Sequence, residues 1–304
     1  MTRAARSAAT LERSDEFSIR PLKEREQIRR ILEGRRPYAA YALGQLEPAL
    51  FRMTEWWLAS GARNQALMLH SRGGLGNATF AMGETAALEA LLRTHPGPRQ
   101  TFLTCEVGHL DTVLRYFALE QRQTMIRMQV TAGTFRPVTG IDVRRLLGSD
   151  AREINRLYRT DGVPSFYSSR QIEDSVYFGA ERDGQLVAVA GTHVISSASA
   201  IAVVGNVYTH PRHRNQHLAQ STTAAVTEQL LRFCREVVLS VDPTNTAAVR
   251  AYERLGYTEV ARLIEGAATR RDATGVTTAL RRLAARVRGR GTGAGDEIVR
   301  LRGT

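Results

Sequence analysis

Residues 205–226 read GNVYTHPRHRNQHLAQSTTAAV, and this stretch predicts a strand, a short basic turn and a long helix. The strand ends at Pro211, because proline has no backbone N–H to donate to a sheet. The first N–H groups of the following helix have no partner inside the helix, and they form the positive end of its dipole. Together with the arginines of the turn, they predict a site for a phosphate or diphosphate group.

A second motif follows in residues 239–257, LSVDPTNTAAVRAYERLGY. The pattern predicts a strand up to Asp242, a turn at Pro243 and a helix that begins after Asn245. Asparagine is a good cap for a helix N-terminus, and Gly256 is a typical helix end. The sequence therefore predicts a second strand–turn–helix unit about thirty residues after the first.

Together the two motifs resemble those of the GCN5-related N-acetyltransferases. Residues 214–219, RNQHLA, are similar to the family's pyrophosphate-binding loop R/Q-x-x-G-x-G/A, and residues 245–257 are similar to its helix N-x-x-A-x-x-x-Y-x-x-x-G-F/Y. The loop departs from the family at His217, which stands where the family has glycine. The Cβ of His217 crowds a backbone that must approach a pyrophosphate, although histidine is enriched among non-glycine residues at positive φ and its ring can meet a phosphate.

The resemblance implies acetyl-CoA as co-substrate, held between two splayed strands. It also implies that the backbone amides of Val207 and Thr209 contact the acetyl carbonyl and the pantetheine arm. The implied general acid is Tyr252, beside the sulfur; the alternative is that Tyr252 is only a core residue of an amphipathic helix. The implied cofactor-binding residues are Val207, Tyr208, Thr209, Arg214, Asn215, Gln216, His217, Leu218, Ala219, Asn245 and Tyr252.

The general base is left open by the residues. His193 is our catalytic candidate, with His210 as a second histidine, because imidazole titrates near neutral pH. The alternative for His193 is a hydrogen-bonded core histidine, and strand alternation does not decide between the two. Asp161, Glu173 or a chain of water molecules are further candidates. No spacing of histidines and cysteines is typical of a metal site, so we expect no metal.

The first half of the chain predicts a hairpin, a helix, a strand, a helix and a strand, which is the order that we also read in the second half. We therefore expect an α/β (α+β) protein with a tandem acetyltransferase fold, in which a degenerate N-terminal copy precedes a complete C-terminal copy. The first copy lacks both motifs, so it is not expected to hold coenzyme A and is interpreted as a wall of the acceptor site. This arrangement resembles the FR47-like branch of the family.

The expected organisation has four segments, with the domain boundary in the turn-rich stretch 131–140. They are a disordered N-terminus (1–18), the degenerate domain (19–132), the catalytic domain (133–272) and an Arg-rich tail (273–304). The tail region from Thr269 onward carries nine arginines and three acids, which is half of the net charge of +12. We expect it to be solvated and partly disordered.

Composition limits the partners and the compartment. No run of 18 apolar residues occurs, so a membrane is not an expected partner. Cys105 and Cys234 are the two cysteines, which indicates reduced core thiols and a cytoplasmic location. Lys23 is the single lysine among many arginines, a bias typical of a GC-rich bacterial genome. The expected acceptor is an amine on a small molecule or peptide, and a homodimer is left open.

Two other functions fit parts of the sequence. The chain could be a non-catalytic acyl-CoA-binding or regulatory protein in which His217 weakens the site. Alternatively, the arginines indicate a nucleic-acid-binding protein. If the chain is an N-acetyltransferase, we expect it to bind nucleic acid only weakly and through the Arg-rich tail.

Overall fold

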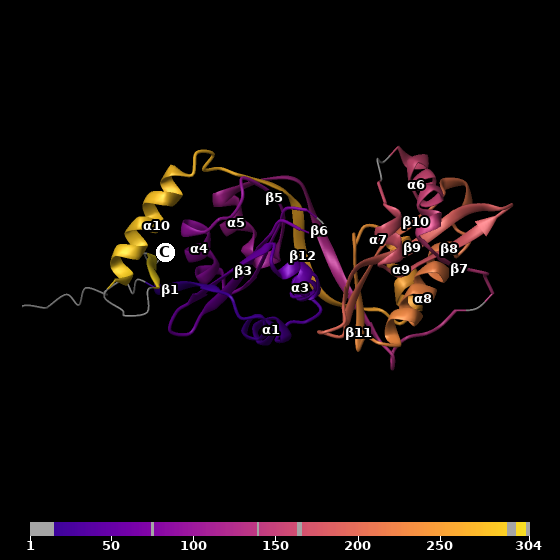
Figure 1. Ribbon diagram of the computed structural model, residues 1–304, viewed down its shortest axis with the longest axis horizontal. Helices are drawn as coiled ribbons and strands as arrows, with labels where there is room; N and C mark the ends of the chain where they lie inside the picture. Colours follow the sequence, from indigo (N-terminus) through magenta and orange to yellow (C-terminus); the bar gives the residue numbers. More distant parts are fainter. Residues whose placement is uncertain (1–14, 74–75, 139, 163–165, 291–295, 302–304) are drawn as a thin grey trace, which may run out of the picture.

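The computed structural model describes residues 15–73, 76–138, 140–162, 166–290 and 296–301. The strands of this part of the chain form one continuous mixed sheet that runs across the whole molecule, with helices on both faces (Figure 1). The strand order is β13-β1-β2-β3-β4-β5-β12-β6-β11-β10-β9-β8-β7. All neighbours are antiparallel except β4–β5 and β10–β11, one parallel pair in each half. None of the described helices is long and apolar enough to cross a membrane.

The first half contains the expected hairpin, helix, strand, helix and strand in that order, and two strands that were not predicted, at residues 15–22 and 54–60, precede them. Its elements are β1 (Asp15–Leu22), α1 (Arg25–Glu33), α2 (Ala40–Gly44), α3 (Pro48–Phe51), β2 (Thr54–Ser60), β3 (Gln65–Ser71), β4 (Ala78–Gly83), α4 (Thr85–Thr94), β5 (Gln100–Glu106), η1 (Val107–His109), α5 (Leu110–Tyr116) and β6 (Phe117–Thr131).

The second half contains both motifs in the predicted elements. These elements are β7 (Arg144–Leu146), η2 (Gly148–Asp150), α6 (Ala151–Tyr158), η3 (Arg159–Asp161), α7 (Ser169–Glu173), β8 (Tyr177–Arg182), β9 (Gln185–Ser196), β10 (Ile201–Thr209), η4 (Pro211–His213), α8 (Leu218–Leu231), β11 (Glu236–Val241), α9 (Thr246–Arg254), β12 (Thr258–Arg270), α10 (Val276–Gly289) and β13 (Glu297–Leu301).

The two halves exchange strands at the middle of the sheet. β6, the last strand of the first half, pairs with β11 over residues 126–131, and β12 of the second half pairs with β5 over residues 263–269. β6 and β12 also pair with each other along most of their length. Each half therefore completes its sheet with a strand of the other.

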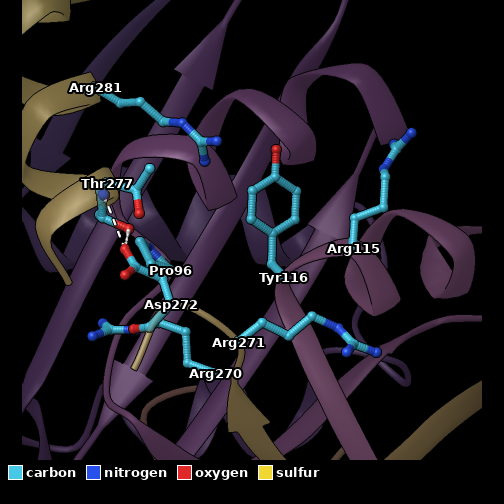
Figure 2. Close-up of a pocket in the computed structure, with 9 residues that line it drawn as sticks. Pro96, Arg115, Tyr116, Arg270, Arg271, Asp272, Thr277 and Arg281 are labelled. Atoms are coloured by element: carbon cyan, nitrogen blue, oxygen red, sulfur yellow. Dashed lines mark hydrogen bonds between the residues drawn. The ribbon is translucent and has the colours of Figure 1, made fainter. Parts of the chain in front are cut away.

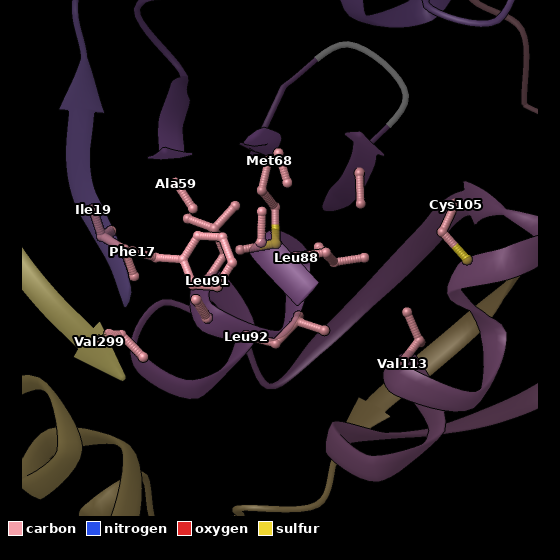
Figure 3. Close-up of a cluster of buried hydrophobic side chains, with 14 of the residues drawn as sticks. Phe17, Ile19, Ala59, Met68, Leu88, Leu91, Leu92, Cys105, Val113 and Val299 are labelled. Carbon is pink, nitrogen blue, oxygen red and sulfur yellow. The ribbon is translucent and has the colours of Figure 1, made fainter. Parts of the chain in front are cut away.

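Among the described residues, five apolar clusters fill the layers around the sheet, and three of them are larger than the other two. One lies between α4 and the strands of the first half (Figure 3), where Phe17, Met68, Leu91 and Val299 meet. A second lies under α1 and α2 and extends across the junction to Val203 of β10. The third packs α8 and α9 on the opposite face of the second half. The free cysteines Cys105 and Cys234 are both buried in these cores, as expected.

The predictions for both chain ends are wrong where the structure describes them. Residues 15–18, expected to be disordered, belong to β1, and residues 1–14 lie outside the described part. The Arg-rich tail forms α10 and β13, and β13 pairs with β1 at the edge of the sheet. The many arginines of the tail suggested disorder. However, Val299 and Leu301 are buried in the first core, and this burial holds β13 in the sheet.

Glu297 fixes the tail to the first half. Its carboxylate accepts hydrogen bonds from Arg282 (3.2 Å), Arg286 (2.8 Å) and the ring Nε2 of His95 (2.7 Å). His95 in turn stacks on Trp57 of β2, with ring centroids 3.4 Å apart. Burial raises the pKa of Glu297, but these three hydrogen bonds outweigh it and lower the pKa to about 2. The carboxylate is therefore ionised at neutral pH and holds two cations of α10.

We predict that Glu297→Gln lowers the free energy of unfolding by about 2 kcal/mol, less than for a fully buried pair because both arginines are half-exposed. The folded-state pKa lies below the ordinary 4.5, so the stabilisation is complete above pH 4.5 and disappears as the pH falls toward about 2. Urea unfolding at several pH values measures this. Glu16→Gln, which removes the exposed pair with Arg300, is the control and should cost less than about 1 kcal/mol. Equal losses for the two variants would contradict the assignment.

Candidate functional site

The site begins where the parallel strands β10 and β11 part. Their pairing runs from Ile201 to Val204 of β10, and β10 then continues to Thr209 without contacting β11. His210 N–H donates to the carbonyl of Val187 in β9 (2.8 Å). Amides alternate in direction along a strand, so the N–H group of Thr209 points away from β9, into the gap that β11 leaves. The splayed strand pair that the resemblance implies is therefore present.

Two β-bulges shape the β10 side of this gap. β9 has His193 as an extra residue between Thr192 and Val194, and β10 has extra length between Gly205 and Tyr208. Asn206 lies in the second bulge with φ of +53°, a backbone conformation that asparagine tolerates better than most residues. The two bulges turn β10 away from β11, and this opens the gap.

The basic turn leads from the gap to the start of α8. His217 is the N-cap residue of α8 and has φ +57°, and Asn215 also lies in the left-handed region at φ +62°. The predicted tolerance of histidine for the glycine position is confirmed in the backbone. Ser221 N–H makes the first helical bond, to the carbonyl of His217, so the three preceding N–H groups of α8 face the gap without helical partners. Arg214 donates to Asp161 (2.8 Å) beside them.

The second motif forms the facing wall. Asn245 caps α9 by accepting a hydrogen bond from Ala248 N–H (3.1 Å), as predicted. Gly256 ends this region with φ +89°, and a Cβ there would lie 1.9 Å from the carbonyl oxygen of Thr134. Glycine is thus required by both the backbone angle and the contact. It holds the end of α9 close to Thr134, and Tyr252 of α9 lines the gap.

These elements enclose a cleft of about 640 Å³. All eleven residues predicted to bind the cofactor line it, although they come from β10, the basic turn, α8 and α9. The further lining residues that were not predicted include two arginines of α9, Arg250 and Arg254. Their spacing of four residues places them on one face of α9, and this was the available signal. With Arg214, they give the cleft a positive lining that suits a phosphate-rich ligand.

Tyr252 is the buried acid of this cleft. Its side chain is 7% exposed, and burial raises the pKa of its hydroxyl to about 12. The hydroxyl therefore carries its proton at neutral pH and is able to donate it. Tyr257, whose ring centroid lies 6.1 Å away, bonds instead to Thr227 (2.7 Å) and does not line the cleft.

His193 has a different environment from the one expected for a free base. Its Nε2 lies 2.8 Å from Oδ1 of Asn206, which accepts hydrogen bonds, so Nε2 carries the proton. Its Nδ1 lies 2.6 Å from the hydroxyl of Tyr41 in α2, which donates to it. Burial lowers the pKa of His193 despite the bond to Asn206. These contacts favour the core-histidine alternative, and the catalytic role of His193 stays a prediction.

Asn206 joins His193 to a group of tyrosines on the acceptor side. Its Oδ1 also accepts from Tyr167 (2.8 Å), its Nδ2 donates to Tyr177 (2.7 Å), and its carbonyl accepts from Tyr158. Neither Asn206 nor Tyr41 was predicted. A bulge leaves no clear sequence signal, and the contact with Tyr41 joins residues that are far apart in the chain.

The other candidate bases already have hydrogen-bond partners in the protein. Nδ1 of His210 accepts from the backbone of Arg212 (3.2 Å), and Glu173 accepts from the N–H of Gly148 (2.7 Å). Asp161 lines the cleft but is paired with Arg214. Within the described residues, no group of three or more histidines, cysteines or acids is arranged to hold a metal ion.

The first half contains a corresponding cleft of about 570 Å³ beyond its own parallel pair, β4–β5. Here the carboxylate of Glu106 accepts a hydrogen bond from the N–H of Gly83 (3.1 Å) and pairs with Arg35. The protein's own carboxylate thus takes the backbone N–H that a ligand would use. This supports the expectation that the first half holds no coenzyme A, which stays a prediction.

Comparisons with known proteins agree with this geometry. Residues 144–257 match the acetyltransferase (GNAT) family. The mycothiol acetyltransferase of Thermobispora bispora is 41% identical over 87 residues, which are 27% of this chain and 30% of that protein. The chain thus matches less than a third of this relative's length.

Two solved structures resemble most of the molecule. A GCN5-related N-acetyltransferase from Kribbella flavida has a TM-score of 0.55 and 18% identity, covering 76% of this chain and 95% of its own. Another, from Sphaerobacter thermophilus, has a TM-score of 0.51 and 17% identity, covering 84% and 95%. At such identities, the likeness establishes the fold.

We predict that Asn206→Ala lowers the free energy of unfolding by about 2–3 kcal/mol, because His193, Tyr167 and Tyr177 lose their shared partner. Asn206→Gly removes the same side chain but relaxes the positive φ, so it should cost about 1 kcal/mol less. Urea unfolding of both variants separates the hydrogen bonds from the backbone. Wild-type stability in both would show that the network does not hold the bulge.

Proposed function

Because residues 144–257 belong to the acetyltransferase (GNAT) family, we propose that this chain is an acetyl-CoA-dependent N-acetyltransferase. The observation that carries the proposal is the cleft where β10 and β11 part. It combines free backbone amides on a strand, the free N-terminus of α8 and a buried tyrosine hydroxyl. A molecule with a diphosphate at one end and a thioester at the other matches these three features in order.

Each part of the cleft has a task in this proposal. The N-terminus of α8 and the arginines of the cleft bind the diphosphate. The amides of Val207 and Thr209 hydrogen-bond the pantetheine arm and the thioester carbonyl, as an added strand would. Tyr252 lies at the inner end, beside the sulfur. The fit depends on His217, whose left-handed backbone aims its neighbouring N–H groups into the cleft.

The reaction is a direct transfer. The nitrogen of a neutral amine attacks the thioester carbonyl, a C–N bond forms and the C–S bond breaks. Tyr252 gives its proton to the departing thiolate, and the amine loses one proton to a base or to water. A phenol with a pKa near 12 is a stronger proton source than water, and it stays protonated at neutral pH.

We propose that the acceptor binds on the side of the sheet that α2, α6 and α7 cover. There Tyr41 of the first half bonds to His193 of the second, so both halves wall the same space. This is the role that an FR47-like arrangement gives to the first half. The acceptor is an amine of a small molecule or peptide, and the name of the Thermobispora relative makes the substrate of mycothiol acetylation one member of a test panel.

A non-catalytic acyl-CoA-binding protein is the second candidate, and His217 favours it. Its Cβ and exposed ring occupy a position where the family's motif has glycine. Under this alternative, acetyl-CoA binds and no acetyl group is transferred.

We predict that acetyl-CoA raises the melting temperature, because a ligand that binds only the folded state stabilises it by about 2.7 kcal/mol at about 100 times its Kd. Differential scanning fluorimetry with acetyl-CoA, free CoA and ATP tests this. Acetyl-CoA and CoA should both stabilise, since they share the diphosphate and pantetheine, and ATP should do so less. A melting temperature that acetyl-CoA leaves unchanged would contradict both the enzyme and the binder.

We predict that Tyr252→Phe lowers kcat about 10²–10⁴-fold with little change in KM, because it removes the proton donor and keeps the ring. CoA release with a panel of amines measures this. Tyr257→Phe is the matched control, a buried tyrosine next to the cleft that should keep near wild-type kcat. Equal rates for Tyr252→Phe and wild type would remove Tyr252 from the mechanism, while binding without turnover on any amine would favour the second candidate.

A further inference from the structure

Helix α10 carries an apolar stripe that the described residues of the protein do not cover. The stripe consists of Val276, Leu280, Leu283 and Val287, which are 57–62% exposed. Their spacing of four, three and four residues places them on one side of the helix. Ala285 lies on the opposite side and is fully buried against the protein. The stripe therefore points directly outward, at the outer edge of the molecule (Figure 1).

Arginines border this stripe on both sides. At 100° per residue, Arg281 and Arg288 lie on one flank, between the stripe and the buried side. Arg282 and Arg286 lie on the other flank, where Glu297 fixes their position. The outer surface of α10 thus has the apolar stripe in the middle and two arginines on each side of it.

A basic pocket of about 370 Å³ continues the flank of Arg281 (Figure 2). Arg115, Arg271 and the hydroxyl-bearing Tyr116 line it together with Arg281. Its one carboxylate, Asp272, is already bound by the first turn of α10, through Gly275 N–H and through the N–H and hydroxyl of Thr278. The pocket therefore has a net positive charge next to the apolar stripe.

We propose that α10 and this pocket dock the protein on an anionic phospholipid surface. An amphipathic helix with an aliphatic side and flanking arginines lies in the membrane interface, with the apolar side about 5–10 Å deep. In that position, the apolar stripe contacts the acyl chains, and Arg281 and Arg288 meet the phosphate groups. The pocket binds further headgroups, because cationic side chains near an anionic lipid surface are attracted to it.

Other occupants fit these features less well. Nucleic acid matches the arginines but gives no partner to four aliphatic side chains. A second copy of the chain could pack against the apolar stripe. However, four aliphatic side chains bury much less surface area than the roughly 800 Å² per partner of a stable interface. It would also bring two sets of arginines together. The expectation of no membrane partner rested on the absence of a spanning segment, which a helix that lies in the interface does not require.

Co-sedimentation with vesicles tests the proposal. The wild-type chain should bind phosphatidylcholine vesicles that contain phosphatidylglycerol, and it should bind vesicles of phosphatidylcholine alone much less. Leu280→Gln combined with Leu283→Gln should lower the partition coefficient more than about tenfold, because two leucines no longer leave water. Arg281→Gln combined with Arg288→Gln should lower binding and its dependence on salt. The leucines are exposed, so the variants keep their fold, which circular dichroism checks.

Met53→Gln is the matched control, because Met53 is also exposed (42%) but belongs to the first half away from α10. It should bind vesicles as the wild type does. Three results would overturn the proposal: no binding to anionic vesicles, binding that the leucine variant leaves unchanged, or a dimer that the leucine variant abolishes while vesicles retain neither protein. Nucleic acid retained equally by wild type and the leucine variant, without vesicle binding, would assign the arginines to a different partner.

Discussion

The separation of β10 from β11 after Val204 is the constraint on which the rest of the site depends. A parallel pair that stayed together would satisfy the amides of β10 with carbonyls of β11 and leave nothing for a ligand. The bulges at His193 and Asn206 turn β10 away, and the hydrogen bond between these two residues joins one bulge to the other. The residues that follow, in the basic turn and at the start of α8, line the gap that opens there.

The exchange of β6 and β12 explains why one cleft requires two halves. β6 supplies the strand beside β11, and β12 supplies the strand beside β5, so the sheet is continuous across the junction. Tyr41 reaches His193 only because this continuity places α2 over β9 and β10. The first half is thus a structural part of the second, although Glu106 occupies the corresponding position in its own cleft. In the first half, this carboxylate takes the N–H group of Gly83, whereas the cleft of the second half keeps the N-terminus of α8 open.

Local sequence signals predicted the elements that form the cleft. Pro211, the capping residue Asn245 and Gly256 each act through their own backbone, and the structure has the strand end, helix start and helix end where these residues stand. Non-local contacts were not predictable in this way. The tail was expected to be partly disordered, but Glu297 and Val299 contact partners in the first half that no local pattern indicates. Strand alternation could not predict the face of the sheet on which His193 lies, because the bulge adds one residue and changes the face of the side chains beyond it.

The central claim is that backbone amides of the cleft bind an acyl-CoA. Amide hydrogen exchange over residues 201–221, with and without acetyl-CoA, tests it most directly. Binding of acetyl-CoA should slow exchange at Val207, Thr209 and the first turn of α8, with little change at Gly83 in the first half. Unchanged exchange in β10 and α8, or protection confined to the first half, would contradict it.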